Sequence, residues 1–268
     1  HDPVLCRDGD RVGLAPGDRR GETESTIHQP PADGDVIAGS EVTVSPGDGG
    51  PPPVGGVVLP TTDGGVDAHL AESWDVSDDG LTWTFKIKEG VKFHNGDEVT
   101  AGDVAWSMNR LLEIGEGMAY VYLGTVESAT AIDDYTVEFK LTQPRGLFLS
   151  SPIRLYVANE DQVMENIVTP GPYGDKGDFG KEWLLTNDAG SGAYKVKEFP
   201  LEEYLLMEKY DGWHGTFVEN VPDEVQFIAT TEAATVRTLM SRQELEITDQ
   251  WQTVEALNAL SELDGVEV

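Results

Sequence analysis

The sequence predicts an α/β fold made of two units with different strand arrangements. The C-terminal end alternates strand and helix patterns, in the segments 224–229, 232–242, 245–247 and 254–263. Such alternation favours a βαβ-type lobe with parallel strand pairing. Upstream, residues 126–132 and 135–141 are strand patterns joined by Asp133-Asp134, which is typical of an antiparallel hairpin. The chain therefore combines a hairpin-rich unit with an α/β lobe.

The hairpin-rich unit also has clear local signals for one strand and one helix. Residues 81–87 alternate apolar and polar side chains after the turn sequence DDG at 78–80, which predicts a half-buried strand. Thr100 and Asp103 have the spacing of a capping box, so a helix is expected over roughly 101–114. Its apolar face holds Val104, Met108, Leu111 and Leu112. Further strand patterns cover 153–158, 193–199 and 204–209.

The N-terminal segment differs in composition from the rest of the chain. Residues 1–73 contain no Phe, Trp or Tyr, whereas the remaining residues contain all 22. A segment this poor in large apolar side chains buries too little surface to offset chain entropy. We therefore expect little fixed structure over residues 1–55. A flexible linker and a disturbed reading frame both fit this composition.

The chain is strongly acidic, with 49 Asp and Glu against 18 Lys and Arg and a net charge of −31. Such a chain repels nucleic acid and anionic membrane surfaces. The acidic residues are scattered along the chain, which is typical of a solvated surface in a protein from a salt-rich environment. We interpret the protein as halophilic.

Several sequence signals limit the chemistry of the chain. Cys6 is the single cysteine, so an internal disulfide and a thiolate metal cluster are excluded. No apolar run approaches the roughly 18 residues of a membrane span. The chain begins at His1 and shows no secretion signal. Two explanations are open, namely removal of a secretion signal and a true start of the protein further upstream.

Tests for catalytic and metal-binding motifs find none that is complete. The acidic turn at 75–80 begins like a calcium loop, but Lys86 occupies the position of its bidentate carboxylate. Gly180-Lys181 lacks the other residues of a phosphate loop. The five histidines include no pair at helical ligand spacing. A metal site assembled from residues distant in sequence is left open.

A series of motifs resembles one known family of proteins. Residues 70–74 read LAESW, 81–87 LTWTFKI, 91–96 VKFHNG, 100–104 TAGDV, 187–196 NDAGSGAYKV, 208–215 EKYDGWHG and 243–247 QELEI. In this order, roughly residues 60–250 resemble the family 5 extracellular solute-binding proteins, the peptide- and nickel-type receptors of ABC importers. Ala193 stands where that family usually has Pro, and Trp213 and His214 stand where it has Tyr and Trp.

The resemblance implies an α/β, periplasmic-binding-protein-like two-lobe fold of type II, with an extra mixed α+β domain beside the first lobe. The fold is expected to be incomplete in this chain, because most of the second lobe would be missing. The expected domains are a Gly/Pro-rich linker or aberrant N-terminus at 1–59, the additional domain at 60–186, part of lobe I at 187–250, and the start of the crossover to lobe II at 251–268.

The resemblance also implies a function in import. We expect an extracellular or periplasmic, cell-surface-associated receptor that closes on a peptide or other small polar solute and delivers it to ABC transporter permease subunits. It implies no catalysis, no cofactor, no metal and no nucleic-acid partner. Receptors for nickel complexes or oligosaccharides are same-class alternatives. A truncated, non-functional remnant and a secreted hydrolase are further alternatives, and no motif supports the hydrolase.

Eight residues are the candidate ligand contacts that the resemblance implies. They are Tyr120, Ser191, Gly192, Trp213, Thr248, Asp249, Gln250 and Trp251. The aromatic side chains offer stacking surfaces, and the glycine-flanked Ser191 offers a hydrogen-bonding hydroxyl beside closely approachable backbone. The competing interpretations are core packing for Trp213, packing or surface exposure for Tyr120, a tight turn at Ser191, and an ordinary loop at 248–251.

We expect the stability of this acidic chain to depend on salt. At about 0.1 M salt the Debye length is ~10 Å and the carboxylates repel one another, whereas at ~1 M it is ~3 Å and the repulsion is screened. The melting temperature should therefore rise with KCl concentration. A melting temperature independent of salt would contradict the halophilic interpretation.

Overall fold

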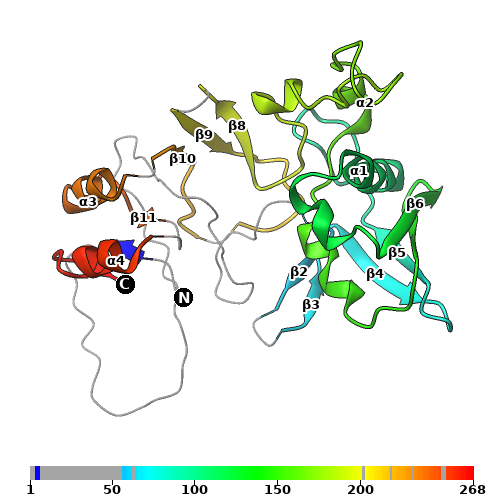
Figure 1. Ribbon diagram of the computed structural model, residues 1–268, viewed down its shortest axis with the longest axis horizontal. Coiled ribbons are helices and arrows are strands. Elements are labelled where there is room, and N and C mark those ends of the chain that lie inside the picture. The colour runs from blue at the N-terminus through cyan, green and yellow to red at the C-terminus, as the bar shows by residue number, and fades with distance from the viewer. Residues whose placement is uncertain are drawn as a thin grey trace. The chain divides into compact units, whose positions relative to one another are not determined.

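The computed structural model describes residues 56–61, 64–200, 203–217, 219–230, 232–248 and 252–268, together with the strand Val4–Cys6 (Figure 1). The chain folds into two compact units. The larger unit comprises Ser45–Lys195 and Tyr210–Val218, and the smaller unit comprises His1–Val44, Val196–Lys209 and Glu219–Val268.

The larger unit is built on a four-stranded antiparallel sheet. Its strands are β4 (Ala71–Val76), β5 (Thr82–Ile87), β6 (Val126–Asp133) and β7 (Thr136–Leu141), in the order β4-β5-β7-β6. The pairing of β6 with β7 confirms the hairpin that the sequence predicts. In β5, buried and less buried residues alternate, as the period of two requires when one face meets the core.

Helix α1 (Ala101–Ile114) begins and ends where the sequence predicts. The Thr100 hydroxyl accepts a hydrogen bond from the Asp103 amide at 3.4 Å, and the Asp103 carboxylate accepts one from the Thr100 amide at 2.9 Å. Both halves of the capping box are therefore formed, which satisfies backbone donors at the helix start. The helix ends at Gly115 in the left-handed conformation.

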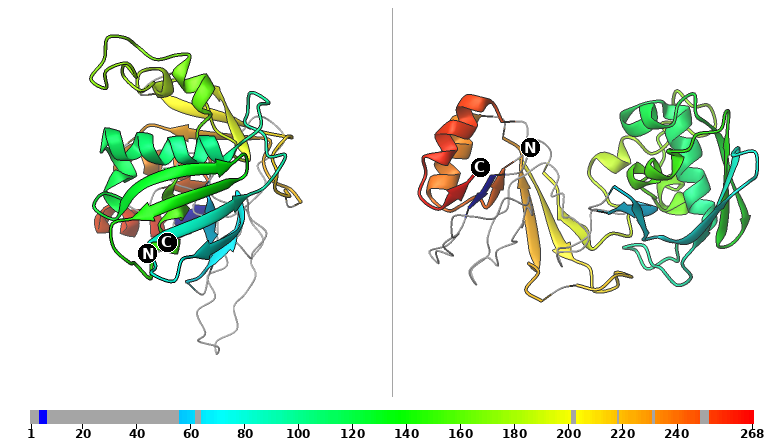
Figure 2. Two further views of the ribbon diagram at one scale, coloured as in Figure 1. Left: turned by 90° about the vertical axis from the view of Figure 1, so that its right-hand side faces the viewer. Right: turned by 90° about the horizontal axis from the view of Figure 1, so that it is seen from below.

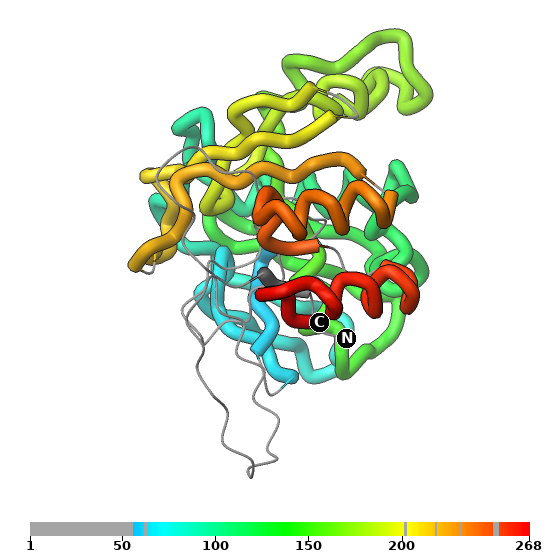
Figure 3. Tube along the Cα trace, turned by 90° about the vertical axis from the view of Figure 1, so that its left-hand side faces the viewer, coloured from blue at the N-terminus to red at the C-terminus, as the bar shows by residue number. Residues whose placement is uncertain are grey.

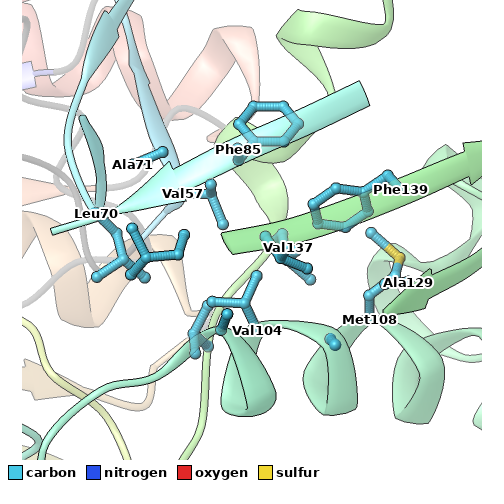
Figure 4. Close-up of a cluster of buried hydrophobic side chains, with 14 of the residues drawn as sticks. Val57, Leu70, Ala71, Phe85, Val104, Met108, Ala129, Val137 and Phe139 are labelled. Atoms are coloured by element: carbon cyan, nitrogen blue, oxygen red, sulfur yellow. The ribbon is translucent and has the colours of Figure 1, made fainter. Parts of the chain in front are cut away.

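The core of the larger unit lies between α1 and the sheet. Figure 2 shows α1 lying across one face of the sheet, and Figure 4 shows Val104 and Met108 of α1 pointing toward Val137 and Phe139 of β7. These four side chains and Phe85 of β5 are fully buried. Burial of each such side chain stabilises the fold by about 1.5–3 kcal/mol relative to exposure. The amphipathic face that the sequence predicts is therefore the face that packs.

The remaining elements of the larger unit are short. They are the hairpin β2 (Val58–Pro60) and β3 (Val66–Ala68), helix α2 (Glu160–Met164), and the 3-10 helices η1 (Gly117–Val121), η2 (Phe148–Ser150), η3 (Pro152–Arg154) and η4 (Trp183–Leu185). The strand predicted over 153–158 is wrong. Pro152 begins a 3-10 turn there, and Tyr156 makes only an isolated bridge to Gly56.

The smaller unit contains two three-stranded sheets and two helices. One sheet has the order β10-β9-β8, formed by β8 (Tyr194–Glu198), β9 (Tyr204–Lys209) and β10 (Glu224–Ile228). Helices α3 (Ala233–Ser241) and α4 (Val254–Ser261) lie side by side (Figure 3). Val236 and Met240 of α3, Leu260 of α4 and Leu245, which follows α3, form a second core.

The second small sheet overturns one prediction of the sequence. Its strands are β1 (Val4–Cys6), β11 (Ile247–Thr248) and β12 (Val266–Glu267), and β1 pairs antiparallel with both neighbours. Parallel pairing was expected here, and none of the pairs among the described strands is parallel. The reason is that β1, from the segment expected to have little structure, lies between β11 and β12.

None of the helices within the described ranges combines the length and apolar character that crossing a bilayer requires.

We expect Thr100→Ala to lower the free energy of unfolding by about 1 kcal/mol, because it removes the hydroxyl that caps α1. Urea denaturation at high salt would measure the change. Ser128→Ala in β6 is a matched control, since its hydroxyl has no partner in the described chain, and it should change stability by less than about 0.5 kcal/mol. Equal effects of the two substitutions would contradict the role of the cap.

Candidate ligand-binding site

The loop at residues 188–193 is held in place by one imidazole. His94 Nδ1 lies 2.6 Å from the Asp188 carboxylate, and His94 Nε2 lies 2.9 Å from the Gly192 carbonyl oxygen. The His94 amide donates to the Gly190 carbonyl at 2.8 Å. The His94 turn therefore contacts the start, the middle and the end of this loop.

Neighbouring segments add further hydrogen bonds to the same loop. The Asn159 amide donates to the Ala189 carbonyl, and the Tyr210 amide donates to the Ala193 carbonyl at 2.8 Å. The Tyr210 hydroxyl donates to the Phe93 carbonyl at 3.0 Å, and its ring meets the His94 ring edge-on at 4.9 Å. Contacts from three separate segments therefore fix the backbone of the loop.

Ser191 and Gly192 lie at the centre of this fixed loop. Ser191 is 4% exposed, and its hydroxyl has no hydrogen-bond partner within the part of the chain that the structure describes. The Gly192 carbonyl is already bonded to His94. The hydroxyl of Ser191 thus keeps both its donor and its acceptor capacity on a rigid backbone.

Trp213 lies in the segment that Tyr210 joins to this loop, but its side chain is buried. It is 8% exposed, and its ring packs against Phe217 at 4.9 Å. A Cβ at residue 215 would lie 2.3 Å from the Trp213 ring, so Gly215 is required for this packing. In the described structure Trp213 acts as a packing residue that shapes the 210–217 segment.

The other candidate contacts belong to other segments of the chain. Tyr120 is in η1 of the larger unit and is 73% exposed. Thr248 is buried in β11 of the smaller unit, where it pairs with Val4 of β1. Asp249, Gln250 and Trp251 lie outside the described residues. The hydrogen bond between the Tyr210 amide and the Ala193 carbonyl joins the 188–193 loop to the 210–217 segment. Among the described candidates, Ser191, Gly192 and Trp213 lie in these two joined segments.

Three residues that organise the site were not among the sequence candidates. His94, Asp188 and Tyr210 each stand inside a motif that carries the family resemblance. The available signal was that the VKFHNG and NDAGSGAY segments both hold polar residues beside glycines. Nothing in a single sequence showed that these segments, 94 residues apart at His94 and Asp188, would meet.

A pair of imidazoles lies beside Trp213. His69 and His214 have ring centres 4.8 Å apart at an interplanar angle of 55°. Burial lowers the pKa of His214 to about 4, with smaller contributions from His69 and Lys88. Burial also lowers the pKa of His69, although its hydrogen bond to the Gly56 carbonyl acts in the opposite direction. Both rings are therefore neutral at pH 7.

No group of three or more His, Cys, Asp or Glu side chains in the described ranges is arranged to hold a metal ion.

Comparison with known proteins identifies the chain. The family described as "Bacterial extracellular solute-binding proteins, family 5 Middle" matches residues 65–267. The chain belongs to this family. This confirms the family that the sequence motifs indicate, whose members are solute-binding proteins and not enzymes.

Two curated relatives are identical to this family 5 protein at about a third of the positions in the aligned segments. The probable D,D-dipeptide-binding periplasmic protein DdpA of Escherichia coli K12 is 33% identical over 204 residues, covering 76% of this chain and 37% of the relative. The dipeptide-binding protein DppE of Bacillus subtilis is 32% identical over 162 residues, covering 53% and 27%. The chain therefore spans only about a quarter to two fifths of the length of these relatives.

Solved structures confirm the periplasmic-binding-protein fold of type II over part of its extent. DppA of Helicobacter pylori in complex with the peptide STSA has a TM-score of 0.64 at 22% identity, covering 86% of this chain and 49% of that one. NikZ of Campylobacter jejuni in complex with Ni(L-His) has a TM-score of 0.65 at 16% identity, covering 85% and 45%. At such identities these likenesses concern the fold alone.

We expect the buried imidazoles to make stability depend on pH. An unfolded histidine takes up a proton near pH 6.5, whereas folded His214 does so near pH 4. Between these values the unfolded chain binds more protons, so stability is retained above about pH 6.5 and lost as the pH falls toward 4. The loss attributable to His214 between pH 7 and 4 should be roughly 3 kcal/mol.

Chemical denaturation of the wild type and of His214→Gln between pH 4 and 7 would measure this effect. The difference in unfolding free energy between the two proteins isolates His214 from the many carboxylates that also titrate. Parallel pH profiles for the two proteins would contradict the neutral, buried state of the ring.

Proposed function

We propose that this chain is the N-terminal portion of the substrate-binding protein of an ABC importer, and that it captures peptides. Family membership over residues 65–267 is the observation that carries the proposal. The matched relatives DdpA and DppE are named as dipeptide-binding proteins. The full receptor would act outside the cytoplasmic membrane and deliver its ligand to permease subunits.

The domain arrangement is part of the same proposal. Residues 60–186 would form the additional domain, 187–250 part of the first lobe, and 251–268 the start of the crossover, with 1–59 as a linker or aberrant start. A ligand cleft between two lobes would close around the peptide by a hinge motion. Such a cleft would need the second lobe from the full-length protein.

The 188–193 loop is the peptide-binding element that the geometry supports best. Its backbone is fixed by His94, Asn159 and Tyr210, so binding would require little ordering of the protein. The unpartnered hydroxyl of Ser191 suits the N–H and C=O groups of a peptide main chain. Exposed Tyr120 supplies an apolar surface on which a ligand side chain could rest.

Nickel complexes are the runner-up ligand, because NikZ shares the fold and its structure holds Ni(L-His). Within the described residues, however, the candidate loop offers hydroxyl and backbone groups, while its Asp188 carboxylate is engaged by His94 and by the Gly190 amide. The imidazole that contacts the loop, His94, has both ring nitrogens engaged. This donor set favours a peptide over a metal chelate.

We expect Ser191→Ala to weaken peptide binding about fivefold to twelvefold, because one hydrogen bond contributes roughly 1–1.5 kcal/mol. The measurement is isothermal titration of the full-length receptor with di- and tetrapeptides at high salt. Ser128→Ala, which lies on β6 away from the loop, is the matched control and should leave the dissociation constant unchanged.

Two outcomes would count against the proposal. Unchanged affinity in Ser191→Ala would remove the loop from the site while leaving the peptide assignment standing. A full-length receptor that binds no peptide at millimolar concentration, but binds a nickel–histidine complex, would replace the peptide assignment with the runner-up.

A further inference from the structure

Among the residues that the structure describes, the imidazoles of His69 and His214 find no hydrogen-bond partner for three of their ring nitrogens. These are Nε2 of His69 and both nitrogens of His214, and all three are buried. His69 is 5% exposed, so its Nε2 has no access to bulk water. Buried polar atoms are nearly always satisfied, and three unsatisfied nitrogens on two facing rings therefore indicate a missing partner.

The backbone fixes the tautomer of His69. Its Nδ1 lies 2.7 Å from the Gly56 carbonyl oxygen, which can only accept a hydrogen bond. A neutral His69 therefore carries its hydrogen on Nδ1 and directs a lone pair from Nε2. A Cβ at residue 56 would lie 2.6 Å from the Ile153 carbonyl oxygen, so Gly56 permits the close packing that positions this acceptor.

This arrangement matches the outer shell of a metal-binding histidine. Such a residue typically donates one ring N–H to a carbonyl or carboxylate, which orients the other nitrogen toward the metal. His69 has this arrangement, because its Nδ1 is engaged by the Gly56 carbonyl oxygen and its Nε2 is left without a partner among the described residues.

The separation of the rings fits a single shared ion. Metal–nitrogen bonds of about 2.0–2.1 Å place the centres of two imidazoles on one ion roughly 5 Å apart. The ring centres of His69 and His214 are 4.8 Å apart. We propose that His69 Nε2 and one ring nitrogen of His214 bind a divalent transition-metal ion at this position, separate from the 188–193 loop.

Two protein ligands set the expected selectivity and strength. Imidazole sites of this kind follow the order of divalent affinities in which Cu²⁺ binds more tightly than Ni²⁺ or Zn²⁺. Water would complete the coordination. With only two protein ligands, the dissociation constant for Cu²⁺ should fall in the micromolar range, far weaker than for a closed four-ligand site.

The positive charge of Lys88 bears on whether the two imidazoles bind a metal cation or an anion. It lies close enough to lower the pKa of both imidazoles, and within the described chain its side chain has no ion pair or hydrogen bond. Its positive charge opposes a metal cation and would attract an anion. The lone pair of His69 Nε2 cannot donate to an anion, however, and this favours the metal.

The test is a titration of the untagged, EDTA-treated full chain with CuCl₂, NiCl₂ and ZnCl₂ near pH 7.5. Trp213 reports binding, since its ring lies 5.9 Å from that of His214 and Cu²⁺ quenches indole fluorescence. Electron paramagnetic resonance of the Cu²⁺ form should show two equivalent nitrogen ligands. We expect saturable micromolar Cu²⁺ binding at one site.

Matched variants locate the site. His69→Ala and His214→Trp should each weaken Cu²⁺ binding at least tenfold, and the second introduces the residue that the family usually has, so the fold should tolerate it. His28→Ala, which removes a histidine outside the pair, should bind as the wild type does. Lys88→Gln should tighten binding about threefold or more, because it removes the opposing charge.

The proposal fails if His69→Ala and His214→Trp, both folded by circular dichroism, bind Cu²⁺ as tightly as the wild type. It also fails if Lys88→Gln leaves Cu²⁺ affinity unchanged while abolishing binding of acetate or chloride. That second outcome would assign the cluster to an anion.

Discussion

The contact between His94 and Asp188 is the constraint on which the rest of the candidate site depends. It joins residues 94 positions apart at 2.6 Å and draws the 188–193 loop onto the turn after β5. Both ring nitrogens of His94 are engaged by this loop, Nδ1 by the Asp188 carboxylate and Nε2 by the Gly192 carbonyl oxygen. A loop rich in glycine has high conformational entropy, and this contact offsets part of the cost of ordering it.

The position of His94 in turn depends on the core beneath the sheet. Phe93, its neighbour, is fully buried, and so is Val99 at the end of the same turn. Asp103 then links this region to α2, because its carboxylate caps α1 at Thr100 and also accepts a hydrogen bond from the Glu160 amide at 3.0 Å. Burial of apolar residues, helix capping and the placement of the loop are therefore coupled within one unit.

Local signals in the sequence were enough to predict much of this unit. The capping box of α1, the alternation in β5 and the turn between β6 and β7 each act within a few residues. Apart from the strand wrongly predicted over 153–158, where Pro152 begins a 3-10 turn, the failures involve long-range pairing. The pairing of β1 with both β11 and β12 spans most of the chain, and no short pattern encodes it. The meeting of His94 with Asp188 was missed for the same reason, whereas Ser191 could be named as a candidate because glycines flank it.

The charge of the chain explains why the His69 and His214 pair stands out. In a protein with 49 acidic and 18 basic residues, a cation readily finds a carboxylate, and ion pairs engage Lys86, Lys92, Lys140, Lys176, Lys181, Lys197 and Lys209. Lys88 has no such partner within the described residues, and the groups that sense its charge are two neutral imidazoles. An acidic surface gathers cations loosely from solution. Selection among these cations requires ordered, buried lone pairs. The proposed selectivity for transition metals therefore arises from the tautomer of His69 and not from net charge.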